Sequence, residues 1–148
     1  MRLGFTETLS AALLHADEQA RKSGHDFVGT EHLLIGILIG KSGDAFRSLQ
    51  AETNVEQLLP ELVSALPEGT SHVTVTGRLP LSPKAQRVVN TAISEAQAAG
   101  QHAASTRFLL LALLGDSDSA VCQILSDGGA DLDELRGLLS RPNGSAEH

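Results

Sequence analysis

Gly29-Thr30-Glu31-His32-Leu33-Leu34 is the stretch that decides the fold, because it predicts the start of a buried helix and has a counterpart later in the chain. The counterpart is Ser105-Thr106-Arg107-Phe108-Leu109-Leu110, which begins 76 positions further on, at residue 105 against residue 29. Both stretches place a threonine three residues before a pair of leucines. An internal repeat of this kind predicts two copies of one structural unit.

The flanking residues extend the repeat on the N-terminal side. A helix is predicted over residues 6–23, with Thr6 as its N-cap, and an equivalent helix begins at Ser82-Pro83. Glycines at positions 24 and 100 are expected to end these helices. Thr30 and Thr106 are expected to cap the helices that follow. The first of these, about 31–40, is apolar on nearly every side and is therefore predicted to be buried.

Each copy is completed by two shorter helices. In the first copy they are expected over 43–52 and after Asn54, where Pro60 should kink or shorten the helix. In the second copy they contain Val121 and begin at Asp131. The predicted fold is an all-α domain of residues 1–140, a pseudo-twofold tandem repeat of two four-helix units. Repeat one spans 5–66, a linker with a short extended piece spans 67–80, repeat two spans 81–140, and 141–148 form a flexible tail.

Composition excludes several classes of function. The net charge of −7 argues against nucleic-acid binding, which depends on basic patches. No apolar run approaches the roughly 20 residues that span a bilayer, and the N-terminus lacks the pattern of a signal peptide. A single cysteine, Cys122, excludes an internal disulfide and indicates a reducing cytoplasm. We expect a cytoplasmic chain that is a monomer in isolation, with no nucleic-acid or membrane partner.

The residues give no support to an enzyme. Gly40-Lys41-Ser42 resembles the end of a phosphate-binding loop, but the glycine that the motif requires five positions before Gly40 is replaced by Ile35. The six histidines show no metal-ligand spacing and are expected at the surface or at helix caps. Cys122 lies in an apolar stretch and is predicted to be an inert buried thiol. We therefore predict no catalytic residue, no metal and no cofactor.

Thr30 and Glu31 form the most informative cluster, and two interpretations remain open. In the first, they only stabilise the helix start, since a hydroxyl can cap it and an acidic side chain complements the helix dipole. In the second, the free N–H groups bind an anion while Glu31 binds a cation. Because Glu31 would repel a simple phosphate, the second interpretation needs a ligand that carries both charges.

The chain resembles the N-terminal repeat domain (Clp N, Clp R) of the Clp/Hsp100 AAA+ unfoldases, most closely the ClpC type. The resemblance runs from Phe5-Thr6 through Gly24-His25 and Gly29–Leu34 to Leu81-Ser82-Pro83-Lys84-Ala85 and on to about Leu139. It implies a non-catalytic module that docks protein substrates or adaptors for a Clp AAA+ ring. In ClpC-type members it also implies binding of phosphoarginine on proteins marked for degradation, with Thr30 and Glu31 as the ligand-binding residues here.

The second repeat departs from the family pattern. Thr106 is kept, but Arg107 stands where the resemblance implies a glutamate, and Ser105 and Phe108 replace a glycine and a histidine. A cation facing a guanidinium is unfavourable, so the second site is expected to be degenerate. Two readings of the whole chain stay open: a docking domain of a Clp unfoldase, or a stand-alone protein that sequesters ligands or regulates without an AAA+ partner.

Overall fold

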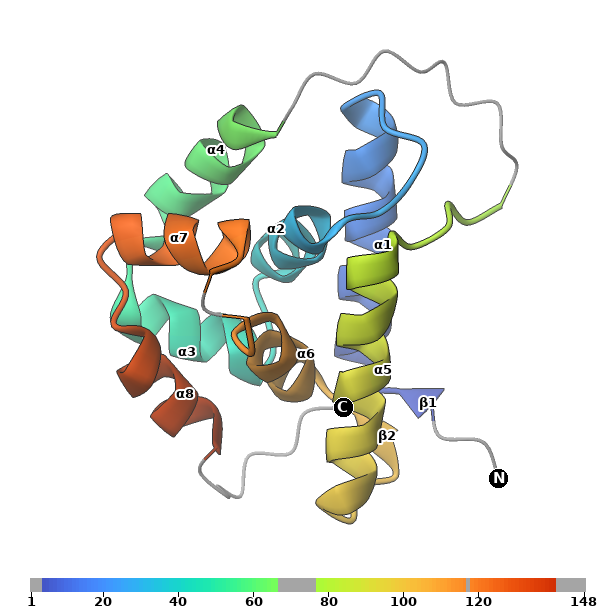
Figure 1. Ribbon diagram of the computed structural model, residues 1–148, viewed down its shortest axis with the longest axis vertical. Helices are drawn as coiled ribbons and strands as arrows, with labels where there is room; N and C mark the ends of the chain where they lie inside the picture. Colours follow the sequence, from blue (N-terminus) through green and yellow to red (C-terminus); the bar gives the residue numbers. More distant parts are fainter. Residues whose placement is uncertain (1–3, 67–76, 117, 141–148) are drawn as a thin grey trace.

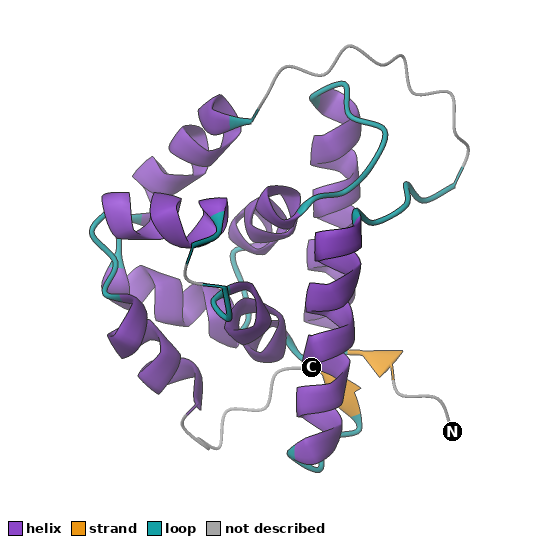
Figure 2. Cartoon of the chain, in the orientation of Figure 1, coloured by secondary structure: helices purple, strands orange, loops and turns teal. Residues whose placement is uncertain are grey.

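The computed structural model describes residues 4–66, 77–116 and 118–140. These residues form eight helices and two short strands (Figures 1 and 2). The elements are β1 (Gly4–Phe5), α1 (Glu7–Lys22), α2 (Thr30–Gly40), α3 (Asp44–Glu52), α4 (Val55–Ala65), α5 (Pro83–Ala98), β2 (Ala103–Ala104), α6 (Thr106–Leu113), α7 (Ala120–Asp127) and α8 (Leu132–Ser140). The predicted all-α tandem repeat is confirmed. None of the described helices has the length and apolar character of a membrane span.

Helix α2 lies at the centre of the molecule. Its residues from His32 to Leu38 are all buried, as the unbroken apolar sequence predicts. It contacts α1, α4, α5 and α7, so every side of the helix meets another element. In Figure 1, α2 and α6 are seen nearly end-on in the middle, with α1 and α5 along one side and α3, α4, α7 and α8 along the other.

The two repeats exchange short backbone pairings, which demonstrates their pseudo-twofold relation. β1 pairs in parallel with β2, so that Phe5 lies opposite Ala104. The same pairing recurs between the positions 76 residues away from these, where Val28 bridges to Leu81. Each repeat therefore contributes its N-terminal segment to the other, and neither pairing can form within one repeat.

Helix starts and ends match between the repeats as the sequence predicts. Thr6 and Ser82 have the same backbone angles, φ −62° and ψ 160°, and each hydroxyl accepts an amide of the following turn at 3.1 Å. Gly24 and Gly100 follow the helices with φ of 77° and 76°, a left-handed conformation that glycine adopts without strain. Because the same backbone angles recur 76 residues apart at both ends of the helix, both repeats begin with the same structural unit.

Pro60 does not shorten its helix, contrary to expectation. Asn54 caps α4 as predicted, and the helix continues through Pro60 to Ala65. Proline removes a single backbone hydrogen bond, and Pro60 is on the exposed side of the helix, where water can satisfy the carbonyl that loses its partner. The buried Leu58 and Leu62 stay in register and hold α4 against the core.

The start of the second repeat is tied to α1 by a buried carboxylate. Asp17 accepts the Leu79 amide through Oδ2 and the Arg21 side chain through Oδ1, both at 2.7 Å. Burial alone would raise the pKa of Asp17, but these two hydrogen bonds and the charges of Arg21 and Arg78 together outweigh it, and the pKa is lowered. Residues 67–76 of the predicted linker and the predicted tail, 141–148, lie outside the described residues.

Candidate functional site

The predicted ligand-binding residues, Thr30 and Glu31, occupy the first turn of α2. Gly29 is the N-cap, so the prediction that Thr30 caps this helix is wrong. An N-cap residue has an extended backbone, and Gly29 has this conformation, with φ −96° and ψ 179°. Thr30 is already helical, and its hydroxyl donates instead to Oε1 of Glu31 at 2.8 Å. Thr106 is likewise the first residue of α6, after the N-cap Ser105.

A buried histidine pair fixes the loop before this helix. The Gly29 amide donates to Nδ1 of His32 at 2.8 Å, and Nε2 of His32 is 2.9 Å from Nδ1 of His25. Since Nδ1 of His32 accepts, Nε2 must carry the proton and donate to His25. His32 thus has a capping role, as expected for a histidine here. Both rings are nevertheless buried, which corrects the expectation of surface histidines.

The surroundings of His32 keep its ring neutral. Burial and, to a smaller extent, the adjacent His25 lower the pKa of His32 to about 4, although Glu31 acts to raise it. A neutral His32 can both accept the Gly29 amide and donate to His25, whereas the charged form could only donate. The loop that presents Glu31 is therefore held by a pair of hydrogen bonds that require a neutral ring.

Glu31 faces a small cavity between the two repeats. The cavity has a volume of about 300 Å³ and is lined by Phe27, Gly29, Thr30 and Glu31 from repeat one and by Ser82-Pro83-Lys84 from repeat two. The Ser82 amide donates to the Val28 carbonyl at 2.8 Å, next to the bridge that joins the repeats. The exchanged pairing thus sets the start of α5 opposite the start of α2. An acidic residue, Glu31, and a basic residue, Lys84, consequently line one cavity.

Five residues of this cavity were not predicted as site residues: Phe27, Gly29, Ser82, Pro83 and Lys84. Ser82 and Lys84 were recognised only as a helix start, because no pattern within the sequence indicates which other helix start they will face. Phe27 is 42% exposed, whereas the adjacent Val28 is buried. A phenylalanine two positions before the Gly29-Thr30-Glu31 stretch was the available signal in the sequence.

The equivalent position in the second repeat is arranged differently. Nη1 of Arg107 donates to the Leu139 carbonyl at 3.5 Å, and its guanidinium lies 4.4 Å from the centre of the Phe108 ring. Thr106 is fully buried, and its hydroxyl accepts the Ala45 amide at 3.2 Å. Both residues are thus engaged in packing, and the degenerate second site remains a prediction.

The different roles of the two threonines follow from one substitution elsewhere. Helix α3 has Gly43 as its N-cap, with φ 98° and no side chain to offer, so the Thr106 hydroxyl from the other repeat binds its first turn. The equivalent N-cap of α7 is Ser119, whose own hydroxyl accepts the Cys122 amide at 3.2 Å. With α7 capped by its own serine, the Thr30 hydroxyl is left for Glu31.

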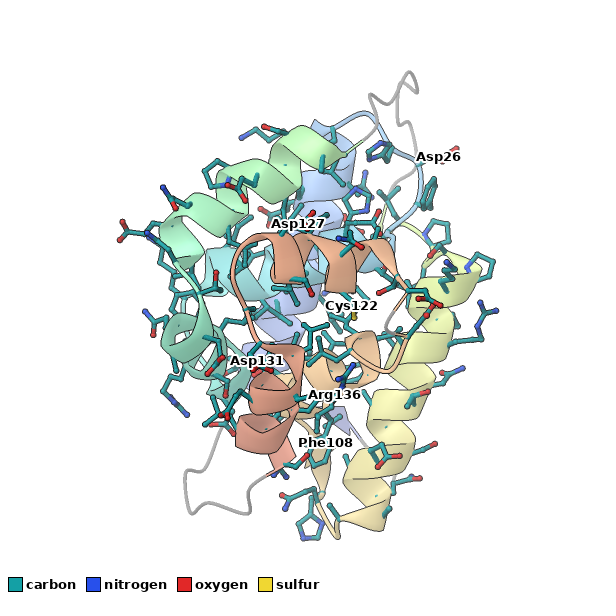
Figure 3. All side chains as sticks on the ribbon, turned by 60° about the vertical axis from the view of Figure 1, so that its left-hand side comes forward. Asp26, Phe108, Cys122, Asp127, Asp131 and Arg136 are labelled. Carbon is teal, nitrogen blue, oxygen red and sulfur yellow. The ribbon has the colours of Figure 1, made fainter. Side chains whose placement is uncertain are left out.

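Cys122 belongs to α7, and Figure 3 shows its side chain on the side of that helix that faces the bundle. Its thiol is fully buried and 3.9 Å from the Leu113 carbonyl. The prediction of a buried thiol is confirmed. Figure 3 also shows Phe108 and Arg136 where α6 faces α8, and Arg136 donates there to the Leu114 carbonyl at 2.8 Å.

The sequence matches the model of the family described as the Clp repeat (R) N-terminal domain, over residues 4–127 and again over 81–146. The chain belongs to this family. Relatives of this Clp N-terminal repeat domain include a ClpA homologue of Trieres chinensis, 33% identical over 91% of the chain, and chloroplastic ClpC1 of Arabidopsis thaliana, 32% identical over 89%. The chain spans 15% and 14% of the length of these relatives.

Solved Clp N-domains have the same fold. The N-domain of ClpD from Arabidopsis thaliana superposes with a TM-score of 0.73 at 20% identity, covering 91% of both chains. The N-domain of ClpV from Vibrio cholerae gives a TM-score of 0.74 at 22% identity, covering 97% of this chain and 88% of that one. At these identities the likeness establishes the fold of the Clp N-terminal repeat domain and nothing about ligands.

Proposed function

We propose that this domain docks protein substrates or adaptors for a Clp AAA+ ring and has no catalytic role of its own. Family membership supports this, as do relatives named as ATP-binding subunits of Clp protease and as chaperone proteins. A ClpV N-domain, with a TM-score of 0.70 to this chain, has been solved in complex with a VipB peptide. The alternative of a stand-alone sequestering protein predicts no ring partner, so co-purification with a Clp ring or its peptidase separates the two.

We further propose that the ligand is phosphoarginine, bound in the small cavity between the repeats. The observation that carries this proposal is that Glu31 and Lys84 both line that cavity. A carboxylate forms strong paired hydrogen bonds with a guanidinium group, whereas Lys84 and the α5 start favour the attached phosphoryl group. A ligand with only a positive charge would be repelled by Lys84, and a ligand with only a negative charge would be repelled by Glu31.

Calorimetry with free phosphoarginine tests this site. Glu31→Gln keeps the shape of the side chain but removes its charge, and a charged hydrogen bond contributes about 1.5–3 kcal/mol. We expect one site per chain in the wild type and a roughly tenfold or greater loss of affinity in the variant.

Glu18→Gln, on an exposed part of α1, serves as the control and should bind like the wild type. Arginine and phosphoserine should each bind far more weakly than phosphoarginine. Two equal sites, or an unchanged affinity in Glu31→Gln, would contradict the proposed site.

A further inference from the structure

A second and larger cavity adjoins the proposed phosphoarginine site. It has a volume of about 640 Å³, which is within the range of small-molecule pockets. Thr30 and Lys84 line both cavities, so the two spaces meet at these residues. From there the larger cavity extends along α5 to a wall that includes Val88, Leu111 and Val121. A ligand held by Glu31 and Lys84 therefore has apolar surface next to it.

The larger cavity follows from a sequence difference between the repeats. In repeat one, a Cβ at Gly36 would lie 2.1 Å from the Ala12 carbonyl oxygen, so glycine is what allows α2 to pack directly on α1. The equivalent residues in repeat two are Ala112 and Val88, which are both larger and both line the cavity. Helix α5 cannot approach α6 as closely as α1 approaches α2, and the space between them stays open.

The charges around this cavity are unevenly placed. Lys84 and Arg87 lie one turn apart on α5, are exposed, and form no ion pair within 4 Å among the described residues. They are a local cationic pair in a chain of net charge −7. Glu95 and Asp116 line other parts of the same cavity. An anionic group of a ligand is therefore favoured near Lys84. An acidic side chain of a ligand would be repelled near Glu95 and Asp116.

We propose that the two cavities bind one extended peptide segment, with a phosphorylated arginine in the smaller and an adjacent aliphatic side chain in the larger. This inference rests on the proposed phosphoarginine site and adds a sequence preference to it. The phosphoryl group meets Lys84 and Arg87 where the cavities join, the guanidinium meets Glu31, and the neighbouring side chain is removed from water against Val88 and Leu111.

Calorimetry with matched peptides tests the preference. Four peptides of equal length carry phosphoarginine flanked on both sides by leucine, glycine or glutamate, or an unmodified arginine flanked by leucine. We expect the leucine-flanked phosphopeptide to bind roughly tenfold more tightly than the glycine-flanked one, because a buried leucine side chain stabilises a complex by about that factor. The glutamate-flanked peptide should bind more weakly than the glycine-flanked one, and the unmodified peptide weakest.

Two variants test the location. Ala112→Leu fills the larger cavity from α6, and Thr91→Phe covers it from the exposed edge of α5. Each should abolish the advantage of leucine over glycine and leave the affinity for the glycine-flanked phosphopeptide unchanged. Asn90→Leu, on an exposed part of α5 outside both cavities, should behave like the wild type.

The possible failures are distinguishable. Equal affinity for the leucine-flanked and glycine-flanked phosphopeptides overturns the two-cavity proposal but leaves the phosphoarginine site intact. An unmodified leucine-flanked peptide that binds as tightly as the phosphorylated one, or no binding of any phosphopeptide, overturns both proposals. A leucine advantage that persists in the folded cavity variants overturns the assignment to this cavity. If neither variant folds, the comparison of the four peptides on the wild type still decides the preference.

Discussion

Single residues explain why the two repeats, which share one backbone arrangement, differ at their equivalent helix starts. Glu31 and Arg107 are equivalent in the repeat but have opposite charges, and only the first lines the cavity with Lys84. A glycine at position 43 draws the Thr106 hydroxyl into packing, whereas a serine at the equivalent position 119 leaves Thr30 at the cavity. The difference between Glu31 and Arg107 changes the charge of the site. The difference between Gly43 and Ser119 changes which threonine hydroxyl can reach it.

The histidine pair predicts a pH dependence of stability at the residue scale. The pKa of His32 is about 4 in the folded protein and 6.5 when exposed. As the pH falls below 6.5, the unfolded chain binds a proton that the folded chain does not, so the free energy of unfolding decreases until about pH 4. The total decrease is on the order of 3 kcal/mol.

Urea unfolding of wild type and His32→Asn between about pH 7 and about pH 4.5 checks this prediction. The asparagine oxygen can accept the Gly29 amide but does not titrate, so the variant should lose less stability than the wild type over this range. His102→Asn, at an exposed position, should keep the wild-type slope. Parallel slopes for wild type and His32→Asn would show that the buried ring does not cause the effect.

Differences between helix pairs appear at the scale of elements. Helix α2 packs tightly on α1 because Gly36 has no side chain, and the backbone of Ala12 fills the space that a Cβ would need. Helix α6 has Ala112 at the equivalent position and stays further from α5, which leaves the larger cavity. The same helical hairpin is thus closed in one repeat and open in the other.

Gly36→Ala should destabilise the protein strongly. The added methyl group would lie 2.1 Å from the Ala12 carbonyl oxygen and 3.0 Å from the Ala16 amide nitrogen, and both neighbours are backbone atoms. We expect the free energy of unfolding to fall by about 3 kcal/mol or more, measured by urea denaturation.

The matched control is Gly137→Ala in α8, where an added Cβ meets nothing within 4 Å. Alanine is the better helix former, so this variant should gain about 0.5–1 kcal/mol of stability. A Gly36→Ala protein as stable as the wild type would mean that α1 and α2 can separate without cost.

The whole molecule is held together by exchange between the repeats. The N-terminal segment of each repeat pairs with a short extended segment of the other. In addition, α3 packs on α6 and α8, and α7 packs on α2. Residues of both repeats line the proposed site, so the site exists only when the halves are joined.

This exchange predicts that neither repeat folds alone. A fragment of residues 1–66 loses the pairing with Ala104 and the contacts of α3 with α6 and α8. We expect it, and a fragment of residues 77–148, to show no cooperative thermal unfolding by circular dichroism. An equimolar mixture should regain helicity and a transition. A cooperative transition in either fragment alone would contradict the prediction.

The sequence by itself determined the duplication, the helices and most of their caps. These are local properties: apolar periodicity, Ser82-Pro83 at a helix start, and a 76-residue spacing that aligns Thr6 with Ser82 and Gly24 with Gly100. It also identified Glu31 as the residue of interest, because an acidic side chain in the first turn of an otherwise apolar helix is visible without a fold. Of the two effects expected of Pro60, a kink or a shorter helix, the shortening does not occur, since the packing of Leu58 and Leu62 outweighs one missing hydrogen bond.

The tertiary structure alone decided which helix starts face each other. Periodicity shows which side of a helix is apolar but not which element covers it, so the presence of Glu31 and Lys84 around one cavity could not be predicted. The open space beside Ala112 and the bond between the Thr106 hydroxyl and the Ala45 amide have the same origin. Each depends on a distance between segments far apart in the chain, and that distance is set only when the two repeats pack together.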